Sequence, residues 1–188
     1  MNAEASTDNT KAEGRKRGRE FSPVQELINN MPYMGMTVLG TVVLIVGSGM
    51  AAWGLVAGAV YLAYGAAGAL WIMVFLCPYC RYWNTRACPC GYGRIAARFR
   101  AKKPVECFSE KFKKHIPVIV PLWLIPVLAG VPLLILAFSW LLLALLIVFA
   151  LDAFVVLPLV STKHGCKECP QRDSCPWMKN RARFARGR

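Results

Sequence analysis

Two long stretches of the chain are almost free of charged side chains. Residues 31–80 contain none, and residues 116–160 contain one, Asp152. Each stretch is about twice the roughly 20 apolar residues that cross a bilayer once as a helix. Because every backbone N–H and C=O must be paired inside the hydrocarbon, each stretch predicts a pair of helices rather than a pair of strands. The expected fold is an all-α integral membrane protein whose four transmembrane helices form two helical hairpins.

The small and aromatic residues within the two stretches predict where the spans end. The first hairpin is expected over residues 32–53 and 55–76, with its turn near Trp53-Gly54. The second is expected over residues 116–136 and 140–159, with its turn near Phe138-Ser139-Trp140. Trp53 and Trp140 would then lie at the outer interface, where amphipathic rings are enriched. The prolines of the third span predict a kinked helix.

The N-terminal stretch has a different character. Residues 1–30 hold five basic and five acidic side chains, and up to about residue 19 their composition predicts disorder. Helical spacing of apolar side chains then predicts a short helix lying along the membrane surface, formed by Phe21, Val24, Leu27 and Ile28. The chain therefore divides into an N-terminus (1–30), hairpin 1 (31–76), a loop (77–115), hairpin 2 (116–160) and a tail (161–188).

The charge distribution predicts the orientation. The chain is 56% hydrophobic, yet it has 23 Lys+Arg against 10 Asp+Glu, a formal net charge of +13. The excess lies in two segments, because residues 77–115 carry a net +8 and residues 161–188 a net +6. Short loops rich in Lys and Arg stay cytoplasmic, so the loop, the tail and both termini are expected on the cytoplasmic side of the cell membrane. This pattern excludes a soluble globular fold, a disordered protein and a secreted disulfide-rich domain.

All eight cysteines fall in these two basic segments. The cytosol keeps thiols reduced, so this placement favours metal or redox chemistry over a disulfide framework. The loop supplies a C-x2-C pair and a C-x-C pair, formed by Cys77, Cys80, Cys88 and Cys90. Four thiolates at this spacing satisfy a tetrahedral zinc site or an iron–sulfur cluster.

The tail supplies three thiolates, from Cys166, Cys169 and Cys175, and needs a fourth ligand. Cys107 and His164 are the nearest candidates. The spacing Cys-x2-Cys-x5-Cys resembles the cysteine run that holds auxiliary iron–sulfur clusters in some radical-SAM maturation enzymes. The resemblance implies iron–sulfur chemistry for these three cysteines.

The function predicted from these clusters is electron transfer between a cytoplasmic donor and a membrane partner. Iron–sulfur is favoured over zinc because the tight Cys88-Pro-Cys90 pair is less typical of zinc knuckles. One alternative is a zinc-stabilised membrane scaffold that assists assembly of a complex. Another is thiol–disulfide exchange, since Cys77-Pro-Tyr-Cys80 resembles the dithiol motif of glutaredoxins, although Cys77 ends a span rather than beginning a helix. The chain shows no Ser/His/Asp set, phosphate loop or paired acids that would indicate an enzyme.

Asp152 is the candidate intramembrane acid. A carboxylate at this depth costs a few kcal/mol on insertion scales and should face the other helices rather than lipid. Its functional interpretation is a proton or ion relay or a quinone-site acid. The alternative is a protonated acid that is hydrogen-bonded to Ser48, to Thr41 or to a carbonyl freed by a proline kink.

Two basic segments, residues 94–103 and 179–188, each follow a cysteine cluster. They suggest an internal repeat of hairpin, cysteine loop and basic helix. Anionic lipids of the inner leaflet attract such segments by about 1 kcal/mol per basic residue. Because both segments are tethered to the bilayer, anionic lipid is favoured over nucleic acid as their partner.

Overall fold

The computed structural model describes residues 20–166, 169, 171–172 and 175–178. These residues form helices and turns, with no strand among them. Within this part of the chain, four helical stretches are long and apolar enough to cross a membrane: Pro23–Gly47, Ala52–Tyr79, Val105–Leu136 and Trp140–Lys163. The predicted all-α fold with four helices of membrane-spanning length is confirmed.

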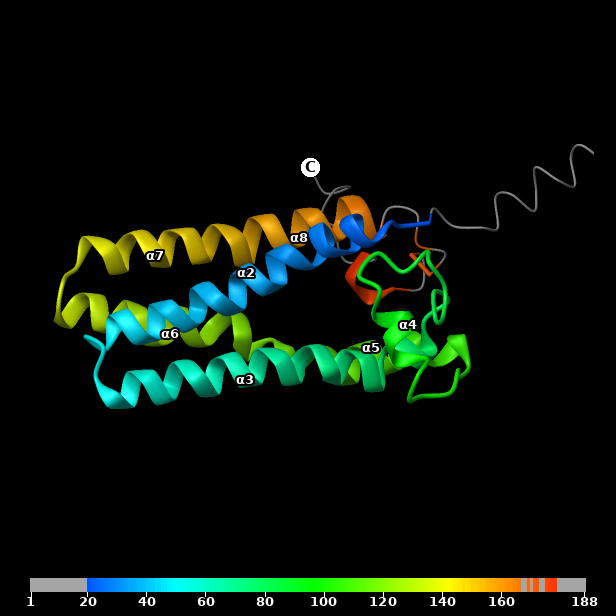
Figure 1. Cartoon of the computed structure of the whole chain (residues 1–188), viewed down its shortest axis with the longest axis horizontal. Coiled ribbons are helices and arrows are strands. Elements are labelled where there is room, and N and C mark those ends of the chain that lie inside the picture. Colours follow the sequence, from blue (N-terminus) through cyan, green and yellow to red (C-terminus); the bar gives the residue numbers. More distant parts are fainter. Residues whose placement is uncertain (1–19, 167–168, 170, 173–174, 179–188) are drawn as a thin grey trace, which may run out of the picture.

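The first two long helices, α2 (Pro23–Gly47) and α3 (Ala52–Phe75), lie side by side (Figure 1). Their connection lies at residues 48–51, so the prediction of a turn at Trp53-Gly54 was wrong. Gly49 and Met50 have φ values of 64° and 60°, a left-handed backbone that ends the helix.

The start of α2 also differs from the prediction. The Ser22 side chain accepts a hydrogen bond from the backbone of Gln25, and the Gln25 side chain bonds back to Ser22, forming a capping box. Pro23 occupies the first turn, where its missing N–H costs nothing. The helix therefore begins at Pro23, and Val24 and its apolar neighbours are its first turns rather than a separate surface helix. The prediction of disorder for residues 1–19 lies outside the described residues.

The third stretch changes helix type where prolines occur. It runs through α5 (Phe108–His115), the 3-10 turn η3 (Ile116–Ile119) and α6 (Pro121–Leu136). Helix α7 (Trp140–Leu151) follows after Ser139, whose side chain accepts a hydrogen bond of 3.5 Å from the backbone of Leu142. The predicted turn near Ser139 is confirmed.

The last span contains two π-helical segments. The chain continues from α7 into η4 (Asp152–Val156), then α8 (Leu157–Val160), then η5 (Ser161–Cys166). Pro158 has no N–H and cannot close an α-helical bond to the carbonyl of Phe154, which explains a widened turn just before it. The sequence analysis did not predict this segment, which begins at Asp152.

Helix α3 packs on α2 through a row of buried glycines: Gly54, Gly58, Gly65 and Gly68. A Cβ atom at Gly65 would lie 2.0 Å from Thr37 Cγ2, so the two helices approach too closely there for any side chain. Among the fully buried core side chains are Met36, Val43, Leu122 and Phe149. This is the close small-residue packing expected between membrane helices.

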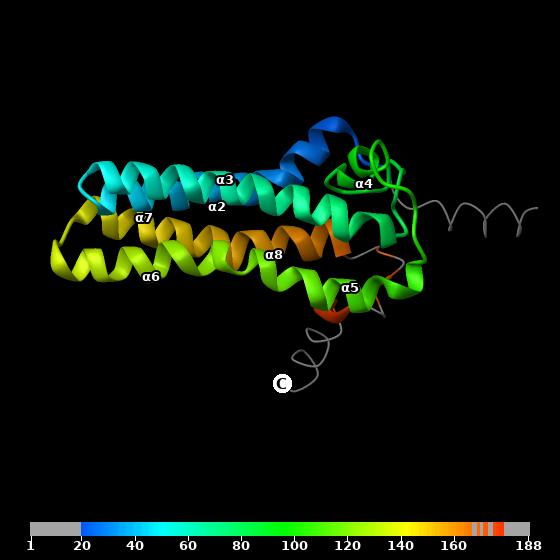
Figure 2. The same cartoon turned by 90° about the horizontal axis from the view of Figure 1, so that it is seen from below.

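Both helix–helix connections lie at one end of the molecule (Figure 2). The opposite end carries η1 (Cys77–Tyr79), α4 (Tyr92–Ala96), η2 (Val105–Cys107) and the cysteines of the tail. The candidate site is built at this second end.

Candidate metal centre

The first two loop cysteines lie in a turn directly after α3. Cys77 is buried and begins η1, and the backbone N–H of Cys80 donates to the Cys77 carbonyl at 3.0 Å. This turn holds both cysteines of the C-x2-C pair beside the end of the span. The backbone N–H of Tyr82 donates to the Cys80 thiol, a bond that by itself favours the thiolate.

The C-x-C pair lies in a second turn, closed by a 3.2 Å hydrogen bond from the N–H of Gly91 to the Cys88 carbonyl. The N–H of Gly93 donates to Cys88 Sγ at 3.4 Å. Gly91 has a φ of 72°, and a Cβ atom there would lie 2.6 Å from Glu26 Oε2. The turn therefore requires glycine at this position both for its backbone conformation and for space.

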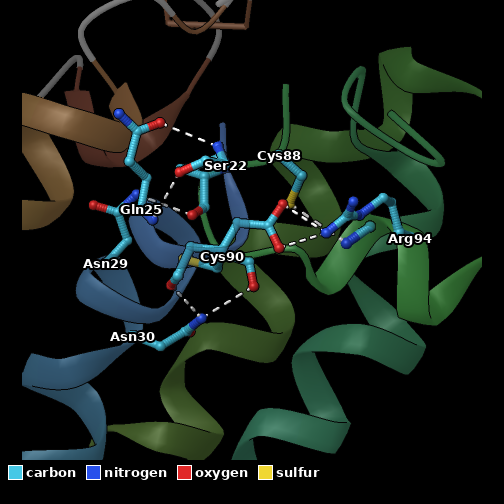
Figure 3. Close-up of polar contacts among 10 residues, drawn as sticks. Ser22, Gln25, Asn29, Asn30, Cys88, Cys90 and Arg94 are labelled. Carbon is cyan, nitrogen blue, oxygen red and sulfur yellow. Dashed lines mark hydrogen bonds and ion pairs between the residues drawn. The ribbon is translucent and has the colours of Figure 1, made fainter. Parts of the chain in front are cut away.

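The N-terminal part of α2 holds this turn in place (Figure 3). Asn29 Nδ2 donates to the Pro89 carbonyl at 2.9 Å, and Asn30 Nδ2 donates to the Cys90 carbonyl at 3.1 Å. The Glu26 carboxylate pairs with the guanidinium of Arg94, with oxygens 2.6 and 2.5 Å from Nη2. Glu26, Asn29 and Asn30 lie on one face of α2. Together they hold the C-x-C turn and the short helix α4 that follows it.

The tail docks on the loop through Gln171, which is only 4% exposed. Its Oε1 accepts from the Arg81 backbone N–H at 3.0 Å, and its Nε2 donates to the Tyr79 carbonyl at 3.3 Å. These two backbone groups lie on either side of Cys80. The N–H of Cys169 donates to the Cys166 carbonyl at 3.3 Å, which is the same pairing that joins Cys80 to Cys77.

The structure brings the loop thiols (Cys77, Cys80, Cys88, Cys90) and the tail thiols (Cys166, Cys169, Cys175) to one place. Within the loop, the Cys77 thiol interacts electrostatically with those of Cys88, Cys80 and Cys90. Between the segments, Cys80 interacts with Cys169 and Cys175, and Cys90 interacts with Cys166. The sequence had predicted one or two metal centres from these two sets of cysteines.

Burial makes these thiols hard to ionise. It raises the pKa of Cys80 to about 12, with neighbouring thiols raising it further and the Tyr82 N–H lowering it. Burial raises the pKa of Cys90 to about 12 as well, and the Cys88 thiol adds to the effect. The pKa of Cys169 is also raised, mainly by burial. Without a cation beside them, Cys80 and Cys90 are therefore protonated at neutral pH.

The donor set fits a thiophilic metal by number and type, since the loop alone offers four sulfurs. As placed, however, no three His, Cys, Asp or Glu side chains of the described residues have the arrangement of a metal site. The thiols are neighbours, and holding an ion would require them to converge further.

Cys107 is the remaining predicted ligand whose side chain the structure describes. Cys107 ends η2 and precedes α5, and in the described part of the chain it is not among the thiols that interact with Cys80, Cys90 or Cys169. His164 falls within η5, but its side chain lies outside the described residues.

Asp152 lies in the bundle against α2. A Cβ atom at Gly35 would be 3.1 Å from its Oδ2, and this oxygen is buried without a hydrogen-bond partner in the described part of the protein. No hydrogen bond joins Oδ2 of Asp152 to Ser48 or Thr41 in the described part of the chain, and both hydroxyls donate to carbonyls of α2 itself.

At one of the prolines, Pro126, the freed carbonyl already has another donor. Pro126 leaves the Leu122 carbonyl without its helical donor, and the Tyr61 hydroxyl donates to that carbonyl at 2.6 Å.

The basic segment 94–103 is helical only through α4, which ends at Ala96. Arg94 is paired with Glu26, while Arg98, Arg100, Lys102 and Lys103 are exposed beside the exposed ring of Phe99. The second basic segment, residues 179–188, lies outside the described residues, so the predicted repeat stays a prediction.

Sequence reasoning missed the residues that position the cysteines: Glu26, Asn29, Asn30, Gly91 and Gln171. Glu26, Asn29 and Asn30 lie in a stretch assigned to the N-terminus, and helical spacing of these polar residues was the one available signal. Nothing in the sequence marks Gln171 as buried.

Comparison with known proteins gives no match: no family model, no curated protein and no solved structure is similar to this chain. The residues and their arrangement therefore carry the functional argument alone.

Proposed function

We propose that this is a multi-pass membrane protein that holds cysteine-ligated metal at its cytoplasmic face and transfers electrons between a cytoplasmic donor and a membrane partner. The observation that carries the proposal is the gathering of loop and tail thiols at one end of four apolar helices. The buried Gln171 supports it by joining the loop to the tail, the two segments that carry these thiols.

The proposal also includes a membrane arrangement. Two helical hairpins span the cell membrane, and the loop, the tail and both termini lie on its cytoplasmic side. The net charges of +8 and +6 on loop and tail support this orientation. The end that carries the two connections would face outward, with Trp53 and Trp140 near the outer interface, where they are 57% and 77% exposed.

Contact with anionic inner-leaflet lipids is part of the proposal. The exposed loop cations Arg98, Arg100 and Lys102 flank Phe99, which is 50% exposed. An exposed ring among cations suits the headgroup region, where the ring can enter the apolar boundary while the cations meet phosphate.

Iron–sulfur is the metal group favoured for the site. When bound, it would supply one-electron chemistry, and the loop thiols would hold it. Backbone N–H groups already donate to the sulfurs of Cys80 and Cys88, and such bonds stabilise a thiolate and tune a redox centre. Zinc at the same thiols is the alternative, and it would make the site a structural platform for assembling a membrane complex. Thiol–disulfide exchange is a weaker alternative, since burial raises the pKa of Cys80.

Anaerobic purification of the full chain in detergent tests the proposal. The expected result is iron with inorganic sulfide and an absorbance near about 400 nm that dithionite bleaches. Colourless protein containing zinc would leave only the structural alternative. Protein that contains neither metal would exclude both, and rapid, reversible oxidation of the thiols would then favour disulfide exchange.

A further inference from the structure

We propose that Asp152 and the uncovered part of α2 beside it dock a transmembrane helix of the membrane partner, and that this helix carries a basic side chain near the middle of the membrane. The inference rests on the proposed function in one respect, because it gives the chemistry of the partner named there. The docking face consists of Asp152 and five exposed side chains of α2: Leu27, Ile28, Met31, Met34 and Val38.

Asp152 lies deep in the membrane-spanning region. It is near the middle of the last apolar stretch, Trp140–Lys163, and its Oδ2 lies against Gly35, at the middle of α2. A Cβ atom at Gly35 would be 3.1 Å from this oxygen. Oδ2 is buried and has no hydrogen-bond partner in the described part of the chain. Such an atom is costly unless something outside this chain pairs with the carboxyl.

The chain offers no cation at this depth. Asp152 is the single charged side chain of residues 31–80 and 116–160. An ionised carboxylate only accepts hydrogen bonds, so backbone carbonyls cannot satisfy it. The hydroxyls of α2 do not serve either, because each already donates to a backbone carbonyl: Tyr33, Thr37 and Thr41. The complementary group is therefore expected from another molecule.

The half of α2 nearer the cysteine loop is uncovered, whereas its other half is enclosed. Met31, Met34 and Val38 are 59%, 54% and 54% exposed. In α2, which the structure describes in full, no residue from Leu39 to Gly47 is exposed. Figure 2 shows the first turns of α2 standing away from the other spans, which leaves this face without a neighbouring helix.

The last span is also open around the carboxyl. Asp152 is half-buried, and the side chains of Leu151, Val155 and Val156 beside it are exposed. The docking face is therefore an apolar surface with one acidic group at its edge. The π-helical segment η4 begins at this residue, and such segments are frequent at functional sites.

The shape and charge of the face favour a basic helix over other occupants. From Leu27 to Val38 the face extends about 16 Å at 1.5 Å per residue, which suits a helix better than a small lipid-soluble molecule. The ammonium of a lysine donates three hydrogen bonds from a long flexible stem. Methionine side chains adapt to the surface that packs on them. A second copy of this chain would bring another carboxyl instead of a cation.

Two synthetic transmembrane peptides test the assignment. Both are leucine-rich and carry a dansyl group, and they differ in one central residue, lysine or leucine. The full chain is reconstituted in phosphatidylcholine vesicles, and energy transfer from its tryptophans reports association. We expect the lysine peptide to associate at least ten times more tightly than the leucine peptide. Equal association of the two peptides would overturn the proposal.

Variants of the carboxyl separate charge from shape. Asp152→Leu should lower association of the lysine peptide to that of the leucine peptide, and Asp152→Asn should remove most of the preference. Thr41→Val is the control, since it deletes a hydroxyl that the docking face does not use. A preference for lysine that persists in Asp152→Leu would contradict the role of the carboxyl. Circular dichroism and Tm show whether each variant is folded.

A photoreactive residue locates the contact. Placed at Val38, it should cross-link to the lysine peptide, and the product should disappear in Asp152→Leu. Placed at Val60, which is 63% exposed on α3, it should give no product. Cross-links between two copies of the chain at Val38 that depend on Asp152 would assign the face to a second copy and overturn the proposal.

Failure of the inference and failure of the proposed function have different outcomes. Preference for the lysine peptide in a chain that is purified without native metal would support the docking face and reject electron transfer. Native iron with sulfide in a chain that binds both peptides equally would retain the function and reject the docking face.

Discussion

Gln171 illustrates how one side chain can decide the geometry of a site. A buried amide is costly unless its donor and acceptor are both paired, and Gln171 pairs both with backbone groups of the loop. Since these groups flank Cys80, the two hydrogen bonds fix the position of the tail along the loop. A hydrophobic residue of similar size could be buried at the same place, but it would not fix the position of the tail relative to the loop.

Replacing Gln171 by leucine should therefore loosen the tail. The Arg81 N–H loses its acceptor, a loss of about 1–3 kcal/mol for a buried donor. In metal-free protein we expect Cys175, which is 8% exposed, to react with a maleimide at least several times faster in Gln171→Leu than in the unaltered chain. The adjacent, exposed Arg172→Ala serves as control, and an equal rate in all three proteins would contradict the docking role.

Asp152 presents the opposite case, a buried polar atom without a partner. Its Oδ2 lies against α2 at Gly35, while the nearby hydroxyls and the carbonyl freed at Pro126 are occupied elsewhere. An unsatisfied group in a bundle core lowers stability, and such groups are typical of functional positions. The π-helical segment that begins at the same residue supports a functional interpretation.

Asp152→Leu keeps the branched shape of the side chain and removes the unpaired oxygen. If the carboxyl has no structural partner, the substitution should stabilise the protein by about 1–3 kcal/mol. At about 2–4 °C per kcal/mol for a chain of this size, Tm in detergent should rise by several degrees. Asp152→Asn is the control, because it retains a buried polar group and should not raise Tm. A lower Tm for Asp152→Leu would show that the carboxyl is satisfied in the native bundle.

At the scale of elements, the first turns of α2 and the C-x-C turn act as one unit. Asn29 and Asn30 bond the turn backbone, and Glu26 both pairs with Arg94 and fills the space beside Gly91. These bonds connect α2 directly to the cysteine loop, so a movement of α2 would shift the backbone at Cys90.

Gly91→Ala tests this connection, with Gly49→Ala as a matched control. Both glycines have positive φ, and a side chain there costs about 1–2 kcal/mol. Only Gly91 would also place a Cβ 2.6 Å from Glu26 Oε2, whereas nothing lies within 4 Å of one at Gly49. We expect Gly91→Ala to lower Tm at least twice as much as Gly49→Ala, and it alone should reduce bound metal. Equal effects on both would argue against the contact.

The elements differ in how far the sequence could predict them. The uncharged stretches predict four helices because burial of backbone polar groups in lipid leaves few alternatives. The turn at Ser139 is predictable from a capping serine between apolar runs. The turn at Gly49 was misplaced because the first stretch contains many glycines and no charge, so several positions could end a helix. The π-helical segment escaped prediction because its cause, Pro158, also suits an ordinary first helical turn.

The sequence could predict which cysteines form the site, but not how the loop and the tail come together there. Cysteine spacing indicates which thiols can chelate, since C-x2-C and C-x-C pairs are local. It cannot show that the tail docks on the loop at Cys80 through Gln171, because that docking depends on how the fourth span returns to the end of the second. The assignment of Cys107 or His164 as the fourth ligand of the tail followed from counting cysteines, and it stays a prediction.

For the molecule as a whole, the orientation in the membrane decides what the thiols can do. The net charges of loop and tail predict a cytoplasmic site, where thiols stay reduced and available to metal. On the other face the same neighbouring pairs, such as Cys80 with Cys169, would be expected to oxidise to disulfides. A test of orientation is therefore also a test of the chemistry.

Sided labelling with a membrane-impermeant maleimide makes this test. Cys107 is half-buried and is not one of the four loop ligands proposed for the metal, so labelling it leaves those ligands unmodified. We expect it to react in inverted vesicles and not in right-side-out ones. A cysteine introduced as Phe138→Cys, at a turn position that is 62% exposed, should show the reverse pattern in a Cys107→Ser background. Labelling of Cys107 from the outside would place all eight cysteines on the oxidising face, and the loop and tail would then be joined by disulfides rather than by metal.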